Sequence, residues 1–472
     1  MDSTQAGRSA APARAWVGWV VFLAVVVGVF AVGVMAASVM ERRQEARVTR
    51  LVVPVADMEP DPAVWGRNYP REYGRFQMTK QSDTRTEFGG ADPRDYLVET
   101  PANVVLFAGY PFSKDFKQAR GHANTVTDVL ATGRINEKSP GTCWTCKSAD
   151  VSRLMKQMGP AAFYKMPFAA LKDSIRFAIG CLDCHDPKTM ALRISRPALI
   201  EALARRGIDV ARLSHQEMRS LICAQCHVEY YFKGEGKYAT FPWDRGTAVD
   251  SVEQYYEAEK FSDWQHAVSK TPMLKMQHPD YEVYLSGIHA FRNVACADCH
   301  MPYRTEGGEK FTDHYIQSPL LNISNSCVVC HRWSEAELVA RVEAIQGRIR
   351  ELRGRAESDI ARAHFDIAAC LQAGATDDDV AAARKAVRAA QMRWDYVAAS
   401  NGMGFHAPQE CMRILGAAAD MAQEARVECA RVLARRGYSG AVAYPDFSTK
   451  EKAQAVSKLF ADNNPPRLLA GR

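Results

Sequence analysis

The sequence has no block of lysine and arginine and no basic stripe interleaved with aromatic residues. It therefore carries no nucleic-acid footprint, and a net charge of +6 over 472 residues is too small to suggest one. No stretch alternates convincingly between apolar and polar residues, as a half-buried strand would. The chain is not compositionally disordered either, because 47% of its residues are hydrophobic and 24% are charged. These absences leave a globular, mainly α-helical protein, long enough for two or three domains.

Near the N-terminus, residues 15–40 form an uncharged apolar run that is long enough to cross a bilayer as a helix. Arg8 and Arg14 precede it, so the positive-inside rule keeps residues 1–14 in the cytoplasm and exports the rest. A cleaved signal peptide, giving a secreted soluble protein, is the alternative, although signal-peptide cores are usually shorter. We predict a membrane anchor. In either case the body lies on the outer, periplasmic face of the cytoplasmic membrane.

The exported part changes character near residue 335. Residues 41–335 are rich in loops with short helices, for example at 196–206, a pattern typical of a chain wound around cofactors. Residues 336–472 carry apolar side chains at helical spacing, with Ser334 and Thr376 as expected N-caps. We predict a catalytic domain at 41–335 and a C-terminal helical region at 336–472 that mediates a homodimer.

Ten of the thirteen cysteines form five Cys-x-x-Cys pairs. In four of them a histidine follows at once, which indicates covalent attachment of a c-type haem, whereas zinc sites do not fix a histidine at that position. The remaining Cys370, Cys411 and Cys429 are an odd number and are expected to be buried small apolar residues. The four histidine motifs are Cys181, Cys184 and His185; Cys223, Cys226 and His227; Cys296, Cys299 and His300; and Cys327, Cys330 and His331.

The first pair, Cys143 and Cys146, is followed by Lys147 instead of histidine. Both thioether cysteines are kept, so the haem is retained while its axial ligand is changed. An amine ligates a metal only when deprotonated, which burial favours. Changing the axial ligand alters the electronics of the iron, and an open opposite face would admit substrate. We therefore predict a catalytic haem at Lys147 and electron-transfer haems at the other four motifs, whose irons each need a second ligand.

These motifs, together with "GHANTVTD", "CAQCHVEYYF", "LKMQHP", "CADCHMP" and "GFHAPQE", resemble the pentahaem cytochrome c nitrite reductases, which form ammonia. The resemblance covers roughly residues 60–450. It implies a multihaem cytochrome c fold with little β structure and long C-terminal helices. It also implies five covalent haems and a six-electron reduction of nitrite to ammonium, with Lys147 as the proximal ligand of the active haem.

The same resemblance implies three residues on the distal side of the active haem. Arg134 would hold the anionic substrate, while Tyr230 and His278 would donate hydrogen bonds and protons as N–O bonds break. Calcium would bind to the side chains of Glu229 and Gln277 and to the carbonyls of Tyr230 and Lys275. Such oxygen donors suit that cation.

For the other four haems the resemblance implies a distal histidine opposite each motif histidine. His215, His266 and His364 are left for structure or surface. The implied pairs are His314 with His185, His122 with His227, His406 with His300, and His289 with His331.

The partners expected from this family are nitrite and a membrane quinol-oxidising multihaem cytochrome as electron donor. Two alternatives stay open at this stage. One is a multihaem cytochrome that only transfers electrons, and the other is a reductase of a related small substrate such as hydroxylamine or sulfite.

Overall fold

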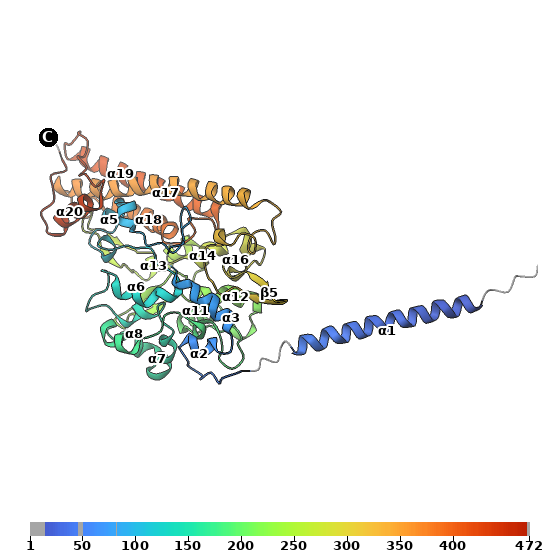
Figure 1. Cartoon of the computed structure of the whole chain (residues 1–472). Coiled ribbons are helices and arrows are strands. Elements are labelled where there is room, and N and C mark those ends of the chain that lie inside the picture. The colour runs from blue at the N-terminus through green and yellow to red at the C-terminus, as the bar shows by residue number, and fades with distance from the viewer. Residues whose placement is uncertain (1–14, 46–50, 82, 470–472) are drawn as a thin grey trace, which may run out of the picture. The chain divides into compact units, whose positions relative to one another are not determined.

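The computed structural model describes residues 15–45, 51–81 and 83–469 (Figure 1). By its internal contacts the chain divides into two compact units, Met1–Pro54 and Val55–Arg472, and each is described by itself. The prediction of a cytoplasmic segment at 1–14 lies outside the described residues.

Among its described residues, the first unit contains the helix α1 (Ala15–Glu45). Its segment Trp16–Glu41 is not buried and is long and apolar enough to cross a membrane. Signal sequences can have the same length and apolar composition. The predicted helical run at 15–40 is therefore confirmed as a helix.

From residue 55 to the fifth motif, the second unit is built of short helices joined by loops. Proline begins several of them, as in α2, α3 and α11, because its fixed φ suits the first helical turn and its missing N–H is not needed there. The α-helices are α2 (Pro62–Gly66), α3 (Pro70–Gln77), α4 (Tyr96–Glu99), α5 (Ala102–Leu106), α6 (Thr125–Ala131), α7 (Asp150–Met158), α8 (Pro160–Lys165), α9 (Phe168–Leu171), α10 (Cys181–Cys184), α11 (Pro197–Arg205), α12 (His215–Ala224), α13 (Val249–Ala258), α14 (Asp280–Leu285), α15 (Ile288–Phe291) and α16 (Cys296–His300). The 3-10 helices are η1 (Met78–Lys80), η2 (Pro111–Ser113), η3 (His122–Asn124), η4 (Gly141–Trp144), η5 (Lys172–Ser174), η6 (Val210–Arg212) and η7 (Pro319–Leu321).

The strands of the described residues form three separate antiparallel pairs, β1 with β2, β3 with β4 and β5 with β6. None is longer than four residues, so the expectation of a mainly α fold with little β structure is confirmed. The strands are β1 (Tyr231–Lys233), β2 (Tyr238–Thr240), β3 (Trp264–Gln265), β4 (Pro272–Met273), β5 (Tyr303–Glu306) and β6 (Glu309–Thr312).

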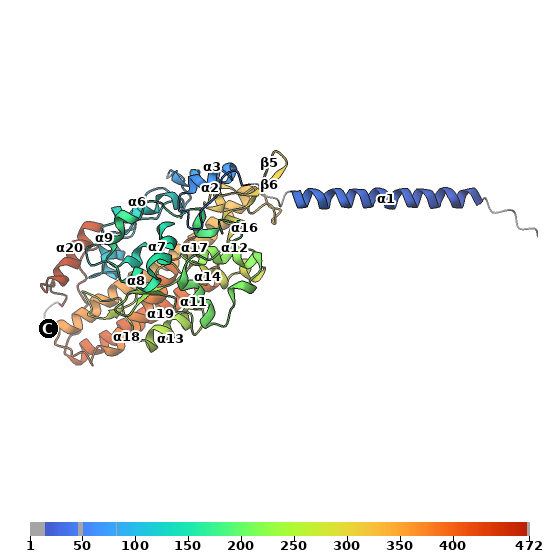
Figure 2. The same cartoon turned by 90° about the horizontal axis from the view of Figure 1, so that it is seen from below.

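The C-terminal part consists of α17 (Glu335–Gln372), α18 (Ala381–Ala398), α19 (Pro408–Arg435) and α20 (Lys450–Ala461). The first three pack against one another and lie along one side of the second unit (Figures 1 and 2). Their contact faces are rich in fully buried alanines, which allow the helices to approach closely, among them Ala363, Ala369, Ala418, Ala422 and Ala425.

The N-cap predictions have different outcomes. Ser334 caps α17, and its hydroxyl and Glu337 form a reciprocal capping box. The prediction at Thr376 is wrong, because α18 begins at Ala381. Thr376 instead makes the same kind of box with Asp379 in the turn that precedes the helix, because capping chemistry can also stabilise a turn that does not start a helix.

The C-terminal helices share a core with the rest of the second unit. Helix α5 packs against both α17 and α20, and one apolar cluster joins the segment around Phe107 to residues of α17, α18 and α19. The functional division at residue 335 stays a prediction. Cys370, Cys411 and Cys429 are buried in these helices, as expected.

Candidate haem-binding and catalytic site

Four pairs of histidines, each far apart in sequence, face one another in the second unit. The distances between their ring centres fall within a narrow range. They are 6.1 Å for His185 and His314, 6.4 Å for His122 and His227, 6.2 Å for His300 and His406, and 6.3 Å for His289 and His331.

This spacing fits one metal ion between two imidazoles. A metal–imidazole bond of about 2 Å, plus about 1 Å from nitrogen to ring centre, puts two opposed ring centres about 6 Å apart. The hydrogen bonds agree, because Nδ1 of His185, His300 and His314 each donates to a backbone carbonyl, of Met190, Gln317 and Thr312 respectively. That tautomer leaves the Nε2 lone pair free for a metal, as metal-ligating histidines usually require.

Most of these imidazoles are held neutral by burial. It lowers the pKa of His122, His185 and His300 to about 4 in each case. His227 is different: burial also acts to lower its pKa, but Asp280 accepts a hydrogen bond from its Nδ1 at 2.9 Å and raises the pKa above the usual value. Asp280 was not singled out from the sequence, although its place two residues after His278 was a usable signal.

A glycine permits the close approach that positions His406. A Cβ atom on Gly287, just before α15, would overlap the carbonyl oxygen of His406. Only glycine lets this backbone pass so near the turn between α18 and α19. The same contact brings His289, in α15, into the neighbourhood of that turn.

The motif cysteines differ from the other three. As whole residues, all ten motif cysteines are at least partly exposed, whereas Cys370, Cys411 and Cys429 are buried. The motif cysteines therefore differ from these three core cysteines, as expected if they carry haem.

The turn that carries Lys147 is fixed from two sides. Trp144 is fully buried and stacks on Phe168 with ring centres 4.2 Å apart. The hydroxyl of Thr125 lies 2.6 Å from the carbonyl oxygen of Lys147 and 2.9 Å from that of His122. This links the lysine turn to η3, which carries a predicted ligand of another haem.

The pKa values of Arg134, Tyr230 and His278 are each affected by the charge of a residue in the first motif. Burial lowers the pKa of His278 to about 3, and the charge of Lys147 adds to that effect. Burial also raises the pKa of Tyr230, with a further contribution from Cys146. These influences indicate that Tyr230 and His278 lie near the Lys147 turn.

Arg134 belongs to the same region. Burial lowers the pKa of Arg134, although the nearby Asp115 and Tyr230 act to raise it. Its guanidinium lies 4.3 Å from the ring centre of Phe112, and Asp115 holds its loop by accepting a bond of 2.7 Å from the Gly133 N–H. Asp115 was also missed, because a lone aspartate before a loop carries no sequence signal.

The predicted calcium donors lie together. Glu229 is fully buried, and its carboxylate accepts bonds from the Gln277 N–H at 2.6 Å and the Tyr256 hydroxyl at 2.8 Å. The Gln277 amide lies 3.2 Å from the carbonyl oxygen of Lys275, and a half-turn of that amide would present its oxygen instead.

The electrostatics of this cluster favour a cation. Burial raises the pKa of Glu229 well above its usual range, and the nearby Glu282 and Asp263 add to it. Glu282 Oε2 is buried without a hydrogen-bond partner among the described residues. Those residues contain no group of three or more His, Cys, Asp or Glu that could hold a metal, so carbonyl and amide oxygens would have to complete the site. The donor set fits calcium.

Five Cys-x-x-Cys motifs and four pairs of facing imidazoles define a multihaem cytochrome c. The chain belongs to the cytochrome c552 family, whose family model matches residues 61–466. Cytochrome c-552 of Bacteroides fragilis is 49% identical over 450 residues, which cover 93% of this chain and 91% of that protein. Cytochrome c-552 of Porphyromonas gingivalis is 48% identical over 459 residues, with 95% and 92% covered.

Among solved structures, the chain is similar to cytochrome c nitrite reductase from Desulfovibrio desulfuricans, a catalytic subunit described with two calcium sites. The TM-score is 0.76 at 32% identity, covering 80% of this chain and 88% of that one. The resemblance drawn from the motifs is thereby confirmed, and the protein is an oxidoreductase that carries haem c. The individual ligand and pocket assignments stay predictions.

Proposed function

We propose that the protein reduces nitrite to ammonium at the haem attached to Cys143 and Cys146, with Lys147 as its proximal ligand. One observation carries this proposal: four motifs have a histidine pair at two-ligand spacing, whereas the first has a lysine and, near it, a cationic, a phenolic and an imidazole side chain. A haem that only relays electrons does not need that set of groups. The nitrite reductase neighbour supports the same substrate.

Haem c, when bound, would supply iron for the substrate at the first motif and single-electron transfer at the other four. The residues that would hold the four relay haems are the cysteine and histidine sets of the motifs with His314, His122, His406 and His289. Five covalent haems are therefore proposed.

The pocket side chains would handle charge and protons. Reduction of nitrite to ammonium consumes six electrons and eight protons and releases two waters, so proton supply matters as much as electron supply. Arg134 would bind the anion through its planar, permanently charged guanidinium. Tyr230 and His278 would donate hydrogen bonds to the substrate oxygens and pass protons to them.

Calcium bound by Glu229, Gln277 and the carbonyls of Tyr230 and Lys275 would hold the pocket in shape. Three of these four donors are next to, or part of, a pocket residue in the sequence: Glu229 precedes Tyr230, Gln277 precedes His278, and one carbonyl is that of Tyr230 itself. The cation would also offset the buried carboxylates around Glu229. Metal removal should therefore lower turnover without loss of haem.

We further propose that α1 anchors the protein to the outer face of the cytoplasmic membrane, where a quinol-oxidising multihaem cytochrome supplies electrons. The long helices α17 and α19 would pair two copies of the chain. Light scattering of protein lacking residues 1–40 should report twice the monomer mass, and a monomer at micromolar concentration would contradict the dimer.

The decisive experiment is a steady-state assay with reduced viologen and nitrite in which ammonium is quantified. Wild type should form ammonium, and only one class of iron should bind cyanide in EPR spectra. Lys147→His should keep five haems and lose turnover, because imidazole changes electron donation to the iron. If every haem were inert to cyanide, or if the Lys147→His variant worked at full rate, the proposal would fail. Faster turnover with hydroxylamine or sulfite than with nitrite would shift the substrate assignment.

A further inference from the structure

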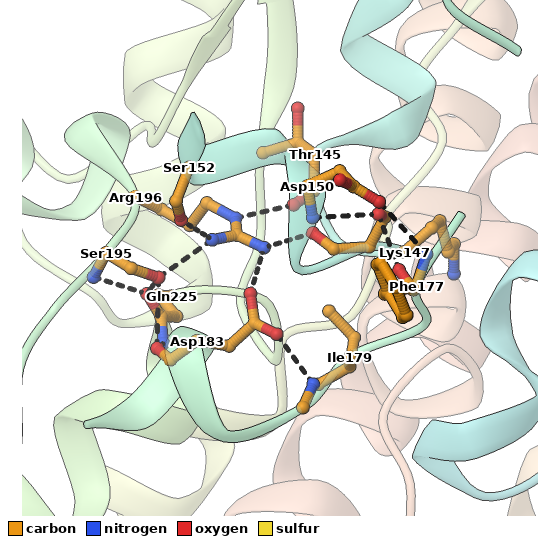
Figure 3. A network of polar contacts seen from close by, with 12 residues as sticks. Thr145, Lys147, Asp150, Ser152, Phe177, Ile179, Asp183, Ser195, Arg196 and Gln225 are labelled. Atoms are coloured by element: carbon orange, nitrogen blue, oxygen red, sulfur yellow. Dashed lines mark hydrogen bonds and ion pairs between the residues drawn. The ribbon is translucent and has the colours of Figure 1, made fainter. Parts of the chain in front are cut away.

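Arg196, the residue before α11, holds both ends of the turn that carries Lys147 (Figure 3). It is fully buried. Its Nε donates to the carbonyl of Thr145 at 2.7 Å, and its Nη2 donates to the carbonyl of Ser148 at 2.9 Å. These two carbonyls lie on either side of Cys146 and Lys147, so one side chain spans the part of the motif that binds the iron.

The same guanidinium reaches the second haem motif. Its Nη2 also donates to Asp183 Oδ1 at 2.5 Å, and Asp183 lies between Cys181 and Cys184. The other carboxylate oxygen, Oδ2, accepts from the Gly180 N–H at 2.7 Å, which fixes the start of α10.

The third motif is connected to the same hydrogen-bond network through Gln225, which lies between Cys223 and Cys226. Its amide nitrogen donates to the Asp183 carbonyl at 2.8 Å, and its amide oxygen accepts from the Ser195 hydroxyl at 3.0 Å. That hydroxyl also lies 2.7 Å from Arg196 Nη1. Residues inside three attachment motifs are thus connected through one arginine.

All five N–H donors of Arg196 have an acceptor. Besides the two carbonyls, Asp183 and Ser195, Nη1 donates to the Ser152 hydroxyl at 2.8 Å. A buried charge is costly unless it is paired and fully hydrogen-bonded, so this saturation is required for the arginine to lie here. Lysine, a point charge with three donors, could not reach the same five acceptors.

The fourth motif provides an internal comparison. Asp298 lies between Cys296 and Cys299, accepts from the Ala295 N–H at 2.8 Å and bonds Arg219 Nη2 at 2.9 Å. Arg219 is also buried, but its Nε has no partner among the described residues. Its Nη1 donates to the Tyr303 hydroxyl at 3.2 Å. An aspartate between the two motif cysteines is therefore paired with a buried arginine in both the second and the fourth motif. Arg196 differs from Arg219 because it also bonds the two carbonyls of the lysine turn.

We propose that Arg196 is a positioning residue for the reaction: it fixes the turn of Lys147 through two backbone carbonyls and couples that turn to the second and third haem motifs through Asp183 and Gln225. This inference rests on the proposed function, because it takes Lys147 as the ligand of the active haem. None of the hydrogen bonds that Arg196 makes among the described residues goes to Arg134, Tyr230 or His278. Its loss should change how the iron is held and leave nitrite binding by Arg134 nearly intact.

The test compares the full-length holoprotein with three variants, Arg196→Lys, Asp183→Asn and Arg219→Lys. Haem content is counted by pyridine haemochrome and intact mass. EPR of the cyanide-responsive iron reports its ligand geometry, and nitrite kinetics separate kcat from KM. Arg196→Lys should keep five haems, shift the EPR signal and lower kcat about tenfold or more, with KM changed less than about twofold.

Asp183→Asn should shift the same signal in the same direction but less, although residue 183 belongs to another haem motif. Arg219→Lys, the matched control, should leave that signal unchanged. A wild-type signal in both the Arg196→Lys and Asp183→Asn variants would overturn the inference, as would an equal shift in Arg219→Lys. If the Arg196→Lys variant does not acquire its haems, the EPR signal of Asp183→Asn by itself decides whether the inference holds. If the wild type has no cyanide-responsive iron, the proposed function itself has failed, which is a distinguishable result.

Discussion

Two regions of the second unit are stabilised in different ways. Between residue 55 and the fifth motif the helices are short, and buried arginines such as Arg196 and Arg219 hold loops by hydrogen bonds to motif residues. In α17, α18 and α19 the helices are long and pack through buried alanines and aliphatic side chains. The first region combines an apolar cluster around Trp144 and Trp243 with polar contacts to the haem motifs, whereas the long helices are organised mainly by their own apolar surface.

This contrast teaches where single changes should act. A substitution in the first region should alter chemistry or haem geometry more than the fold, once the haems are attached. One in the long helices should alter stability while the spectra of the haems stay the same.

The largest expected effect comes from withholding haem. Full-length protein made without haem attachment should lose the structure of residues 55–331, because that region has few long elements to stabilise it alone. Residues 335–435 should persist as a helical fragment. Limited proteolysis with mass spectrometry measures this, and we expect cleavage in the first region to be at least about tenfold faster. Equal cleavage rates in the two regions would remove the distinction.

Next comes His278→Ala. Loss of a proton-handling side chain should lower kcat for nitrite by about 10²–10⁴-fold, while five haems and their absorption spectrum are kept. The matched control is His215→Ala, since His215 is exposed at the start of α12 and should be dispensable. A full rate in the His278 variant would exclude it from the reaction.

A smaller effect is expected in the long helices. Ile360 is fully buried in α17, and Ile360→Ala should lower the free energy of unfolding by about 2–5 kcal/mol through lost apolar contact and a cavity. Urea unfolding followed by circular dichroism measures the loss, and turnover below the transition should stay at the wild-type level. Ile288→Ala, at an exposed side chain, is the control and should change stability by no more than about 0.5 kcal/mol. A shifted haem spectrum in Ile360→Ala would show that the two regions are not separable.

The smallest effect is expected at a helix cap, because the same kind of capping box occurs in both regions. Ser214 with Glu217 caps α12 and Ser334 with Glu337 caps α17, each as a capping box. Replacing either serine by alanine should cost about 1 kcal/mol, since a cap is local chemistry. Hydrogen exchange of first-turn amides should accelerate about fivefold in both variants. A large difference between the two variants would mean that the haem-bearing region changes even local helix energetics.

Features whose chemistry is local in the chain could be predicted from the sequence. The five motifs, the helix at α1, the N-cap at Ser334 and the long C-terminal helices were all predicted from residues a few positions apart. The prediction at Thr376 failed for a local reason as well, because a capping box can close a turn that does not continue into a helix.

Features that join distant segments could not be derived in this way. The distal histidines were assigned through a family resemblance, and no spacing in the chain pairs His314 with His185. Asp115 and Arg196 were missed, because an isolated acidic or basic residue has no periodicity and no motif until its partners are known. Asp280 was also missed, although it lies two residues after His278.

The amino-acid sequence by itself determined the covalent chemistry of this protein, since a Cys-x-x-Cys pair and the residue after it lie within one turn of chain. It also determined the odd lysine and the helical character of the C-terminal part, which follows from side-chain periodicity. Only the tertiary structure decided that four histidine pairs lie with ring centres 6.1–6.4 Å apart, that Gly287 passes against His406, and that one arginine joins three motifs. The physical reason is that these contacts depend on packing between segments far apart in the chain, and such packing is set by the burial of the whole core.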